Sequence, residues 1–241
     1  MTKDGSTAIG VVMDESGSMS HLVNDTIGGF NTFLREQKAI PGEATLTLAL
    51  FNHDYKLVHD GVSLKDVPEL TTFTYKPSGT TALLDAVGRT VDTMGRKFAS
   101  MKEEDRPSKV VVLIMTDGEE NASSDYKHAR IKEMVAHQQE KYGWSFAFIG
   151  ANIDSFAVGS SMGLSKGSTY SYASNSVGTQ SLYSSMSAGT TNFRRSKMAA
   201  NFNMVDPIQV TPITVVPTVV DVTLTPTVVD TANVVKGDST K

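Results

Sequence analysis

Asp14, Ser16 and Ser18 alternate along a short polar stretch that directly follows an apolar run, residues 8–13. A strand that ends in one carboxylate and two hydroxyls at alternate positions presents three oxygen atoms toward one point. Hard cations such as Mg²⁺ bind oxygen ligands in an octahedral shell and usually keep several water molecules. The stretch therefore predicts one part of a divalent-metal site.

Two further segments carry oxygen atoms suited to the same chemistry. Asp117 follows the clearest apolar run of the chain, residues 109–115, and the pair Thr80-Thr81 precedes an amphipathic segment. Each motif alone has an ordinary structural explanation, because Asp14 can cap the segment that follows it and Asp117 can belong to a strand-end turn. The presence of all three in one chain favours a metal site.

Apolar patterning predicts the elements that would position these residues. Continuous or alternating apolar runs predict strands, and apolar residues at helical spacing predict helices. The predicted strands are 8–13, 45–51, 55–59, 109–115, 144–149 and 169–172. The predicted helices are 22–40, one that begins near 81 and reaches 98, 126–141, 152–161 and 177–199.

Strands that alternate with helices predict an α/β, doubly wound fold. We expect a mostly parallel sheet of about six strands, with one antiparallel edge strand at 55–59 and helices on both faces. Functional sites in such folds lie at the carboxyl ends of the strands. Both Asp14 and Asp117 fall at such ends, which supports the metal site.

The composition changes from about residue 205. Four prolines punctuate a stretch rich in Val and Thr: Pro207, Pro212, Pro217 and Pro226. Pro-Thr-Val-Val-Asp occurs at 217–221 and again at 226–230. Proline excludes a helix and a central strand position. We predict a domain over 1–204 and an extended, β-prone arm over 205–241. Residues 205–235 either contact a neighbouring subunit for self-assembly or fold back as an edge strand.

Composition excludes several classes of function. The 241 residues contain no cysteine, which rules out disulfides, zinc–thiolate sites and thiol nucleophiles. The net charge of −4 gives no general attraction to nucleic acid or to an anionic membrane. No apolar stretch approaches the roughly 20 residues of a spanning helix. A polar start predicts no cleavable secretory signal, so we expect a cytoplasmic protein or one incorporated in a phage particle.

The three motifs together, in this order and context, resemble the von Willebrand factor A (vWA) domain and its metal-ion-dependent adhesion site (MIDAS). The resemblance covers about residues 7–200. Similar bacterial and phage sequences often read Gly-Gly-Thr-Ala-Leu before the second helix, which aligns with residues 79–83. That alignment makes Thr81 the implied threonine ligand, with Thr80 as the alternative.

The resemblance implies a role for each residue of the metal site. Ser16 and Ser18 would bind the cation directly, and Thr81 would bind it directly or through water. Asp14 and Asp117 would mostly hold coordinated waters and orient the serines. The cation would be Mg²⁺, or else Mn²⁺ or Ca²⁺. Its open position would accept a carboxylate from a protein partner.

Other polar residues have simpler explanations. Glu15 should alternate away from the metal toward solvent, and Glu119 and Glu120 are expected to be solvated loop residues. The five histidines show no metal-ligand spacing. The basic cluster 194–197 suits the end of a helix, where cations are favourable.

Enzymatic alternatives fit the residues less well. A phosphatase of the haloacid dehalogenase type needs a second Asp as general acid two residues after Asp14, where this chain has Ser16. Neither a nucleophile elbow nor a P-loop is present. The sequence therefore predicts a non-catalytic, metal-dependent binding domain with an arm for assembly. The alternative is a structural subunit of a phage particle or bacterial assembly, in which metal binding is incidental or stabilising.

Overall fold

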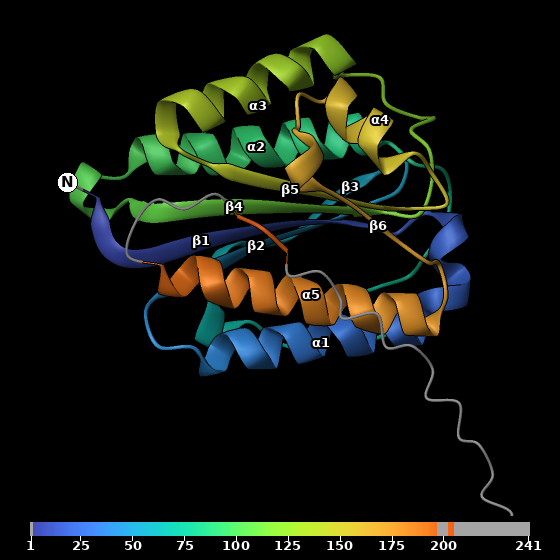
Figure 1. Cartoon of the computed structure of the whole chain (residues 1–241), viewed down its shortest axis with the longest axis horizontal. Coiled ribbons are helices and arrows are strands. Elements are labelled where there is room, and N and C mark those ends of the chain that lie inside the picture. The colour runs from blue at the N-terminus through green and yellow to red at the C-terminus, as the bar shows by residue number, and fades with distance from the viewer. Residues whose placement is uncertain (1, 197–201, 205–241) are drawn as a thin grey trace, which may run out of the picture. The chain divides into compact units, whose positions relative to one another are not determined.

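The computed structural model describes residues 2–196 and 202–204, which form a six-stranded sheet in the order β3-β2-β1-β4-β5-β6 (Figure 1). The strands are β1 Lys3–Asp14, β2 Ala44–Phe51, β3 Tyr55–Ser63, β4 Pro107–Thr116, β5 Ser145–Ala151 and β6 Thr169–Tyr172. Among them only β3 is antiparallel to its neighbour, β2. The predicted mostly parallel sheet with an antiparallel edge strand is confirmed.

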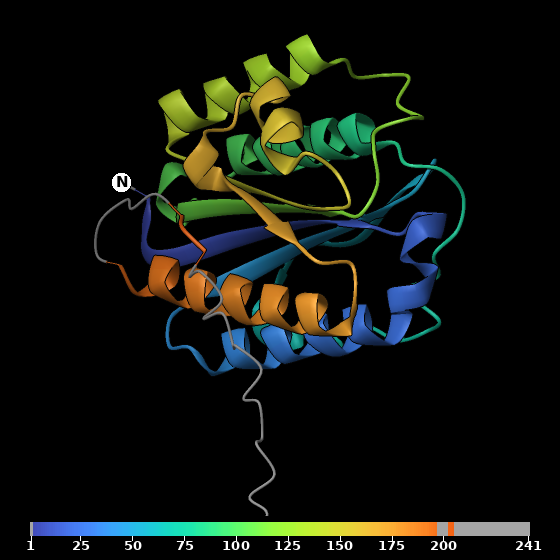
Figure 2. The same cartoon turned by 45° about the vertical axis from the view of Figure 1, so that its right-hand side comes forward.

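Helices cover both faces of the sheet, as predicted. They are α1 Val23–Ala39, α2 Leu83–Ser100, α3 His128–Tyr142, α4 Ser155–Ser161 and α5 Ser176–Arg195. Helices α1 and α5 lie side by side on one face, and α2, α3 and α4 lie on the other (Figures 1 and 2). Short 3₁₀ turns occur at Gly17–Leu22, Leu64–Asp66, Glu103–Asp105 and Lys166–Ser168.

The two central strands, β1 and β4, are buried on both faces. Their side chains alternate between the two hydrophobic clusters, so Ile9 and Val11 face α1 and α5 while Ala8 and Val12 face α2 and α3. Burial of one large aliphatic side chain contributes about 1.5–3 kcal/mol. The positions at which β1 and β4 end are therefore fixed by the core.

Close packing of helix on sheet depends on one glycine in β1. A Cβ at Gly10 would stand 2.9 Å from the sulfur of Met94 in α2. The absence of a side chain there lets α2 approach β1 closely. The close approach of Met94 to Gly10 helps to hold α2 against β1.

Several boundaries differ from those predicted. β1 begins at Lys3 rather than 8, and β3 continues to Ser63 rather than 59. Helix α3 begins at His128 rather than 126, and the N–H of Tyr126 donates to Asp85 just before it. The last helix ends at Arg195, and residues 197–199 of its predicted span lie outside the described residues.

The predicted arm, 205–241, and the boundary after residue 204 also lie outside the described residues. Residues 202–204 pack against the domain: Phe202 is buried, and its N–H donates to Ser145 Oγ at 3.3 Å. The N–H of Met204 donates to the Tyr170 hydroxyl at 3.0 Å. No helix in the described residues is both long and apolar enough to cross a membrane.

Candidate metal centre

Asp14 and Asp117 lie at the same edge of the sheet. Asp14 is the last residue of β1 and Asp117 follows β4, which is the neighbour of β1. The hydroxyl of Thr116 donates to Asp14 Oδ2 at 2.6 Å, and the N–H of Ser16 donates to Asp14 Oδ1 at 2.6 Å. Both carboxyl oxygens of Asp14 are thus oriented by neighbouring donors.

Hydrogen bonds between side chains join the loop after β1 to the loop after β4. Ser16 Oγ and Ser18 Oγ lie 3.0 Å apart, and the Ser18 hydroxyl donates to Asp117 Oδ1. Together with the bond from Thr116 to Asp14, these contacts form one connected cluster. The structure therefore brings together four of the five residues predicted for the metal site.

Gly118 shows where the fifth residue, Thr81, lies. A Cβ at Gly118 would stand 3.4 Å from Thr81 Oγ1 and 3.5 Å from Ser18 Oγ. Both hydroxyls therefore border the same small space beside the start of the loop. Thr81 is buried, whereas Thr80 is exposed. The structure brings Thr81 to the cluster, and its role as a ligand stays a prediction.

Two oxygen atoms of the cluster lack hydrogen bonds. Asp117 Oδ2 is buried, and it has no partner among the described residues. Thr81 Oγ1 likewise makes no hydrogen bond to any residue of the described part. A buried carboxylate oxygen without a donor is costly. A bound cation would supply the missing positive charge.

Burial and charge also affect Asp14. Burial raises the pKa of Asp14, and the nearby negative charge of Asp117 adds to this effect. In the described part of the chain, no three His, Cys, Asp or Glu side chains gather as a metal-ligand cluster. A cation here would therefore depend on hydroxyl and carboxylate oxygens, the donor set that suits Mg²⁺, Mn²⁺ or Ca²⁺.

Helix capping does not account for the loop after β1. Ser16 occupies the N-cap position of the turn Gly17–Leu22, yet it makes no side-chain capping hydrogen bond within the described residues. Asp14 instead accepts the N–H of Ser16, two residues on. Hydrogen bonds among the polar residues of the loop itself, Asp14, Ser16 and Ser18, therefore shape this segment.

The prediction for Glu15 was wrong. Glu15 is buried rather than solvent-facing, and its carboxylate accepts the N–H of Lys76. Its main-chain N–H donates to Phe51 O at 2.6 Å, and its carbonyl accepts from Ser78 N at 2.9 Å. The chain turns after Asp14, so strand alternation no longer sets the direction of the next side chain. Glu15 fastens the loop that precedes α2 to the loop after β1.

The prediction for Glu120 was also wrong, whereas Glu119 is exposed as expected. Glu120 Oε2 accepts the N–H of Leu84 at 2.9 Å, at the start of α2. The α2 N-cap residue, Ala82, makes no side-chain capping bond, so a carboxylate from another loop satisfies this end of the helix. No sequence signal pointed to this partner, because Thr80 and Thr81 at the predicted helix start are themselves capping residues.

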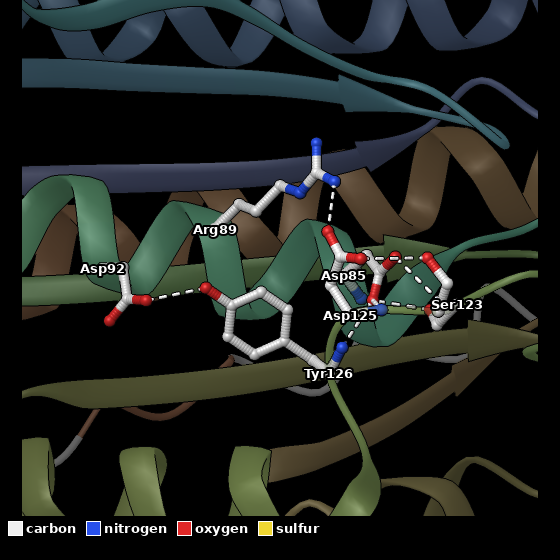
Figure 3. Close-up of polar contacts among 7 residues, drawn as sticks. Asp85, Arg89, Asp92, Ser123, Asp125 and Tyr126 are labelled. Atoms are coloured by element: carbon white, nitrogen blue, oxygen red, sulfur yellow. Dashed lines mark hydrogen bonds and ion pairs between the residues drawn. The ribbon is translucent and has the colours of Figure 1, made fainter.

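A second carboxylate extends the attachment between the loop after β4 and α2 (Figure 3). Asp85 accepts the N–H groups of Ser124, Asp125 and Tyr126 at 3.0, 3.0 and 2.8 Å. Two side-chain contacts continue along the helix: Arg89 to Asp125 at 2.6 Å and the Tyr126 hydroxyl to Asp92 at 2.7 Å. Sequence analysis missed this network, because none of its residues stands out by type or spacing.

Comparison with known proteins gives matches among solved structures. No family model matches the chain, and no curated protein matches it. The PilB minor pilin from Streptococcus sanguinis (D319A mutant) is 11% identical, with a TM-score of 0.51 over 78% of this chain and 62% of that one. The vWF domain of the type V pili tip protein Mfa5 from Porphyromonas gingivalis is 12% identical, with a TM-score of 0.52 over 76% and 95%.

A third structure carries a metal. Proximal thread matrix protein 1 from the mussel byssus, with a zinc-occupied MIDAS motif, is 14% identical, with a TM-score of 0.54 over 78% of this chain and 46% of that one. The present chain thus spans less than two thirds of the pilin and of the byssus protein. At such identities the likeness concerns the arrangement of strands and helices alone. The chain has the fold of a von Willebrand factor type A domain.

Proposed function

We propose that the chain is a non-catalytic, metal-dependent protein-binding domain whose divalent cation is held by Asp14, Ser16, Ser18, Thr81 and Asp117. The observation that carries this proposal is the buried Asp117 Oδ2, which lacks a partner among the described residues. It belongs to a cluster in which hydroxyl oxygens from two other loops border one small space.

The side chains divide into neutral and charged donors. Ser16, Ser18 and Thr81 would offer hydroxyls as neutral ligands, while Asp14 and Asp117 would orient the serines and coordinated water. A cation with few direct carboxylate ligands stays electrophilic and attracts a carboxylate at an open position. The partner would therefore be a protein that presents an acidic side chain.

The similar structures support the coarser part of this proposal. Two are pilus proteins, and one is a byssus matrix protein whose MIDAS motif holds zinc. Divalent-metal binding and a role in protein contacts are consistent with these similar structures. Mg²⁺, Mn²⁺ or Ca²⁺ is our choice from the oxygen-only donor set, and zinc belongs in any test.

Metal binding is tested first, by calorimetric titration of the full chain with Mg²⁺, Mn²⁺, Ca²⁺ and Zn²⁺ after treatment with a chelator. We expect saturable binding of at least one cation, weakened at least about tenfold by Asp117→Asn. Asp125→Asn is the matched control, because Asp125 lies in the same loop and contacts Arg89 rather than the cluster. Equal affinities for both variants and the wild type would refute the site.

Partner binding is tested next, by capture from the native source with and without chelator. The wild type, Asp14→Ala and a chain that ends at Met204 are compared. Metal-dependent capture that Asp14→Ala abolishes supports the proposal. Capture that survives chelation and Asp14→Ala, yet requires residues 205–241, contradicts it and favours the structural-subunit alternative.

A further inference from the structure

Thr81 is held by an unusual pair of hydrogen bonds to Asn121. The N–H of Thr81 donates to Asn121 Oδ1 at 2.9 Å, and the N–H of Asn121 donates to Thr81 O at 3.0 Å. Thr81 stands before Ala82, the N-cap residue of α2, so helical hydrogen bonds do not fix its main chain. Contacts to Asn121 fix it instead.

Asn121 is itself held in place by its neighbours on both sides. Glu120 Oε1 accepts the N–H groups of Ala122 and Ser123 at 3.0 and 2.7 Å, while its second oxygen reaches Leu84 in α2. The main chain on both sides of Asn121 is thus anchored to α2, although Asn121 itself is exposed.

The attachment continues beyond this point. Asp85 binds three successive N–H groups of the same loop, as Figure 3 shows. The loop that begins with Asp117 is therefore fastened along the first turns of α2. Because Thr81 directly precedes α2, Asp117 and Thr81 belong to one tightly bonded unit even though different segments supply them.

We propose that Asn121 is a positioning residue of the metal centre. It holds the Thr81 main chain so that the Thr81 hydroxyl faces the space beside Ser18 and Asp117. The inference rests on the proposed function, since it assigns Asn121 a role toward the bound cation. Its contribution would pass entirely through the hydroxyl of Thr81.

Removal of the Asn121 side chain leaves the buried N–H of Thr81 without its acceptor. We expect Asn121→Ala to weaken cation affinity about tenfold, the lower end for residues that orient metal ligands. Asn121→Asp keeps an oxygen at the acceptor position, so it should restore wild-type affinity or exceed it. Failure of Asn121→Asp to improve on Asn121→Ala would overturn the inference.

A matched control separates positioning from general loosening of the loop. Ser123→Ala removes the hydroxyl that accepts from Asp85 and donates to Glu120, in the same loop but away from Thr81. We expect both alanine variants to lower the midpoint of thermal unfolding, with cation affinity changed less than about twofold by Ser123→Ala. Equal losses of affinity in the two variants would overturn the inference.

A double-mutant cycle with Thr81→Val supplies the decisive test, by calorimetric titration of the full chain with Mg²⁺ and Mn²⁺. Valine keeps the shape of threonine and removes the hydroxyl. Asn121→Ala should then weaken binding less than about twofold further. A full tenfold loss in that background, or no loss from Thr81→Val alone, overturns the inference. Weakening by Ser18→Ala would still support the metal site, whereas absence of binding by the wild type refutes the proposed function itself.

Discussion

Buried charges lie at both ends of the sheet, and the hydrogen-bond partners of these charges differ between the two ends. At the carboxyl end, Asp14 and Asp117 lie close together, and one oxygen of Asp117 has no donor among the described residues. At the opposite end, Lys109 and Arg194 are buried cations whose donors meet main-chain carbonyls. At the carboxyl end, an acceptor oxygen lacks a hydrogen-bond donor among the described residues. We call the opposite end, where Lys109 and Arg194 donate to main-chain carbonyls, the matched end.

At the matched end, Lys109 and Arg194 bind the carbonyls at the C-terminal ends of two helices, α5 and α1. Lys109 Nζ donates to the carbonyls of Phe193, Arg194 and Ser196 at 3.0, 2.5 and 2.8 Å, where α5 ends. The Arg194 guanidinium in turn donates to carbonyls that follow α1, those of Ile40 and Gly42, both at 3.2 Å. Cations are favourable at helix C-termini, where free carbonyls carry partial negative charge.

The difference separates structural charges from a binding site. Burial lowers the pKa of Arg194, and its guanidinium donates to main-chain carbonyls of the described residues. At the carboxyl end, by contrast, Asp117 Oδ2 has no donor among the described residues. Of these two ends, we expect the carboxyl end to be the one that responds to divalent cations.

The largest effect is expected at the matched end. Lys109→Met keeps the apolar stem and removes three hydrogen bonds to main-chain carbonyls, so the free energy of unfolding should fall by about 3 kcal/mol or more. Urea denaturation should show the same loss with Mg²⁺ and with chelator. Lys102→Met, at an exposed position, is the control. A loss below about 1 kcal/mol, or one that cation removes, would contradict the comparison.

Cation addition should come next in size. At 100 times the dissociation constant, a cation that binds only the folded chain raises the free energy of unfolding by about 2.7 kcal/mol. Lys109→Met should keep this increment, because its contacts lie at the other end of the sheet, and Asp117→Asn should lose it. Denaturation curves of the three proteins test both statements. An increment missing from Lys109→Met would show that the two ends are coupled.

Asp14→Asn should have a smaller effect and, unlike Lys109→Met, should raise the free energy of unfolding. The folded chain binds a proton at Asp14 more tightly than the unfolded chain, since burial raises the Asp14 pKa above its ordinary value of 3.8. The wild type therefore loses stability as pH rises from the unfolded-state pKa of Asp14 through its higher folded-state pKa. In chelator at neutral pH, asparagine should raise the free energy of unfolding, on the order of one net hydrogen bond, about 1 kcal/mol.

This advantage of Asp14→Asn should vanish in acid, where the wild-type carboxyl is protonated. Thermal unfolding across pH measures it, with Asp66→Asn at an exposed position as the control. A variant less stable than the wild type at neutral pH in chelator would show that Asp14 is already compensated without a cation.

The smallest effect concerns the surface pair of Figure 3. The hydrogen bond from Arg89 lowers the pKa of Asp125 below 3.8. Its stabilisation is therefore present above the unfolded-state pKa and is lost as pH falls through the lower folded-state value. Asp125→Asn should lower the midpoint of thermal unfolding slightly at neutral pH, converge with the wild type in acid and leave cation affinity unchanged. A change in affinity would link this exposed pair to the proposed metal centre.

The central sheet could be predicted from the sequence because β1 and β4 are buried on both faces, which makes their apolar runs continuous. The edge strand β3 was predicted too short, since it is half-exposed and its pattern fades toward Ser63. Element positions followed from such periodicity. The exact ends of elements, such as the start of α3 at His128, did not follow from periodicity.

The candidate site was only partly predictable for a related reason. Asp14, Ser16 and Ser18 form a compact pattern after a clear strand. Glu120, in contrast, acts on Leu84, 36 residues earlier in the chain. Glu15 likewise turns toward a loop that contacts it only in three dimensions. Loop residues without periodicity give no sequence signal for such long-range contacts.

Gly118 has a consequence for the evolution and engineering of this domain. A methyl group at that position would touch the hydroxyls of Thr81 and Ser18 at ordinary van der Waals distances, 3.4 and 3.5 Å. The fold would tolerate this methyl group, yet the space between the hydroxyls of Thr81 and Ser18 would become narrower and partly apolar. One added carbon would thus weaken the proposed cation site while every oxygen donor stays in place, so an intact donor motif alone does not prove that a chain of this fold holds an ion.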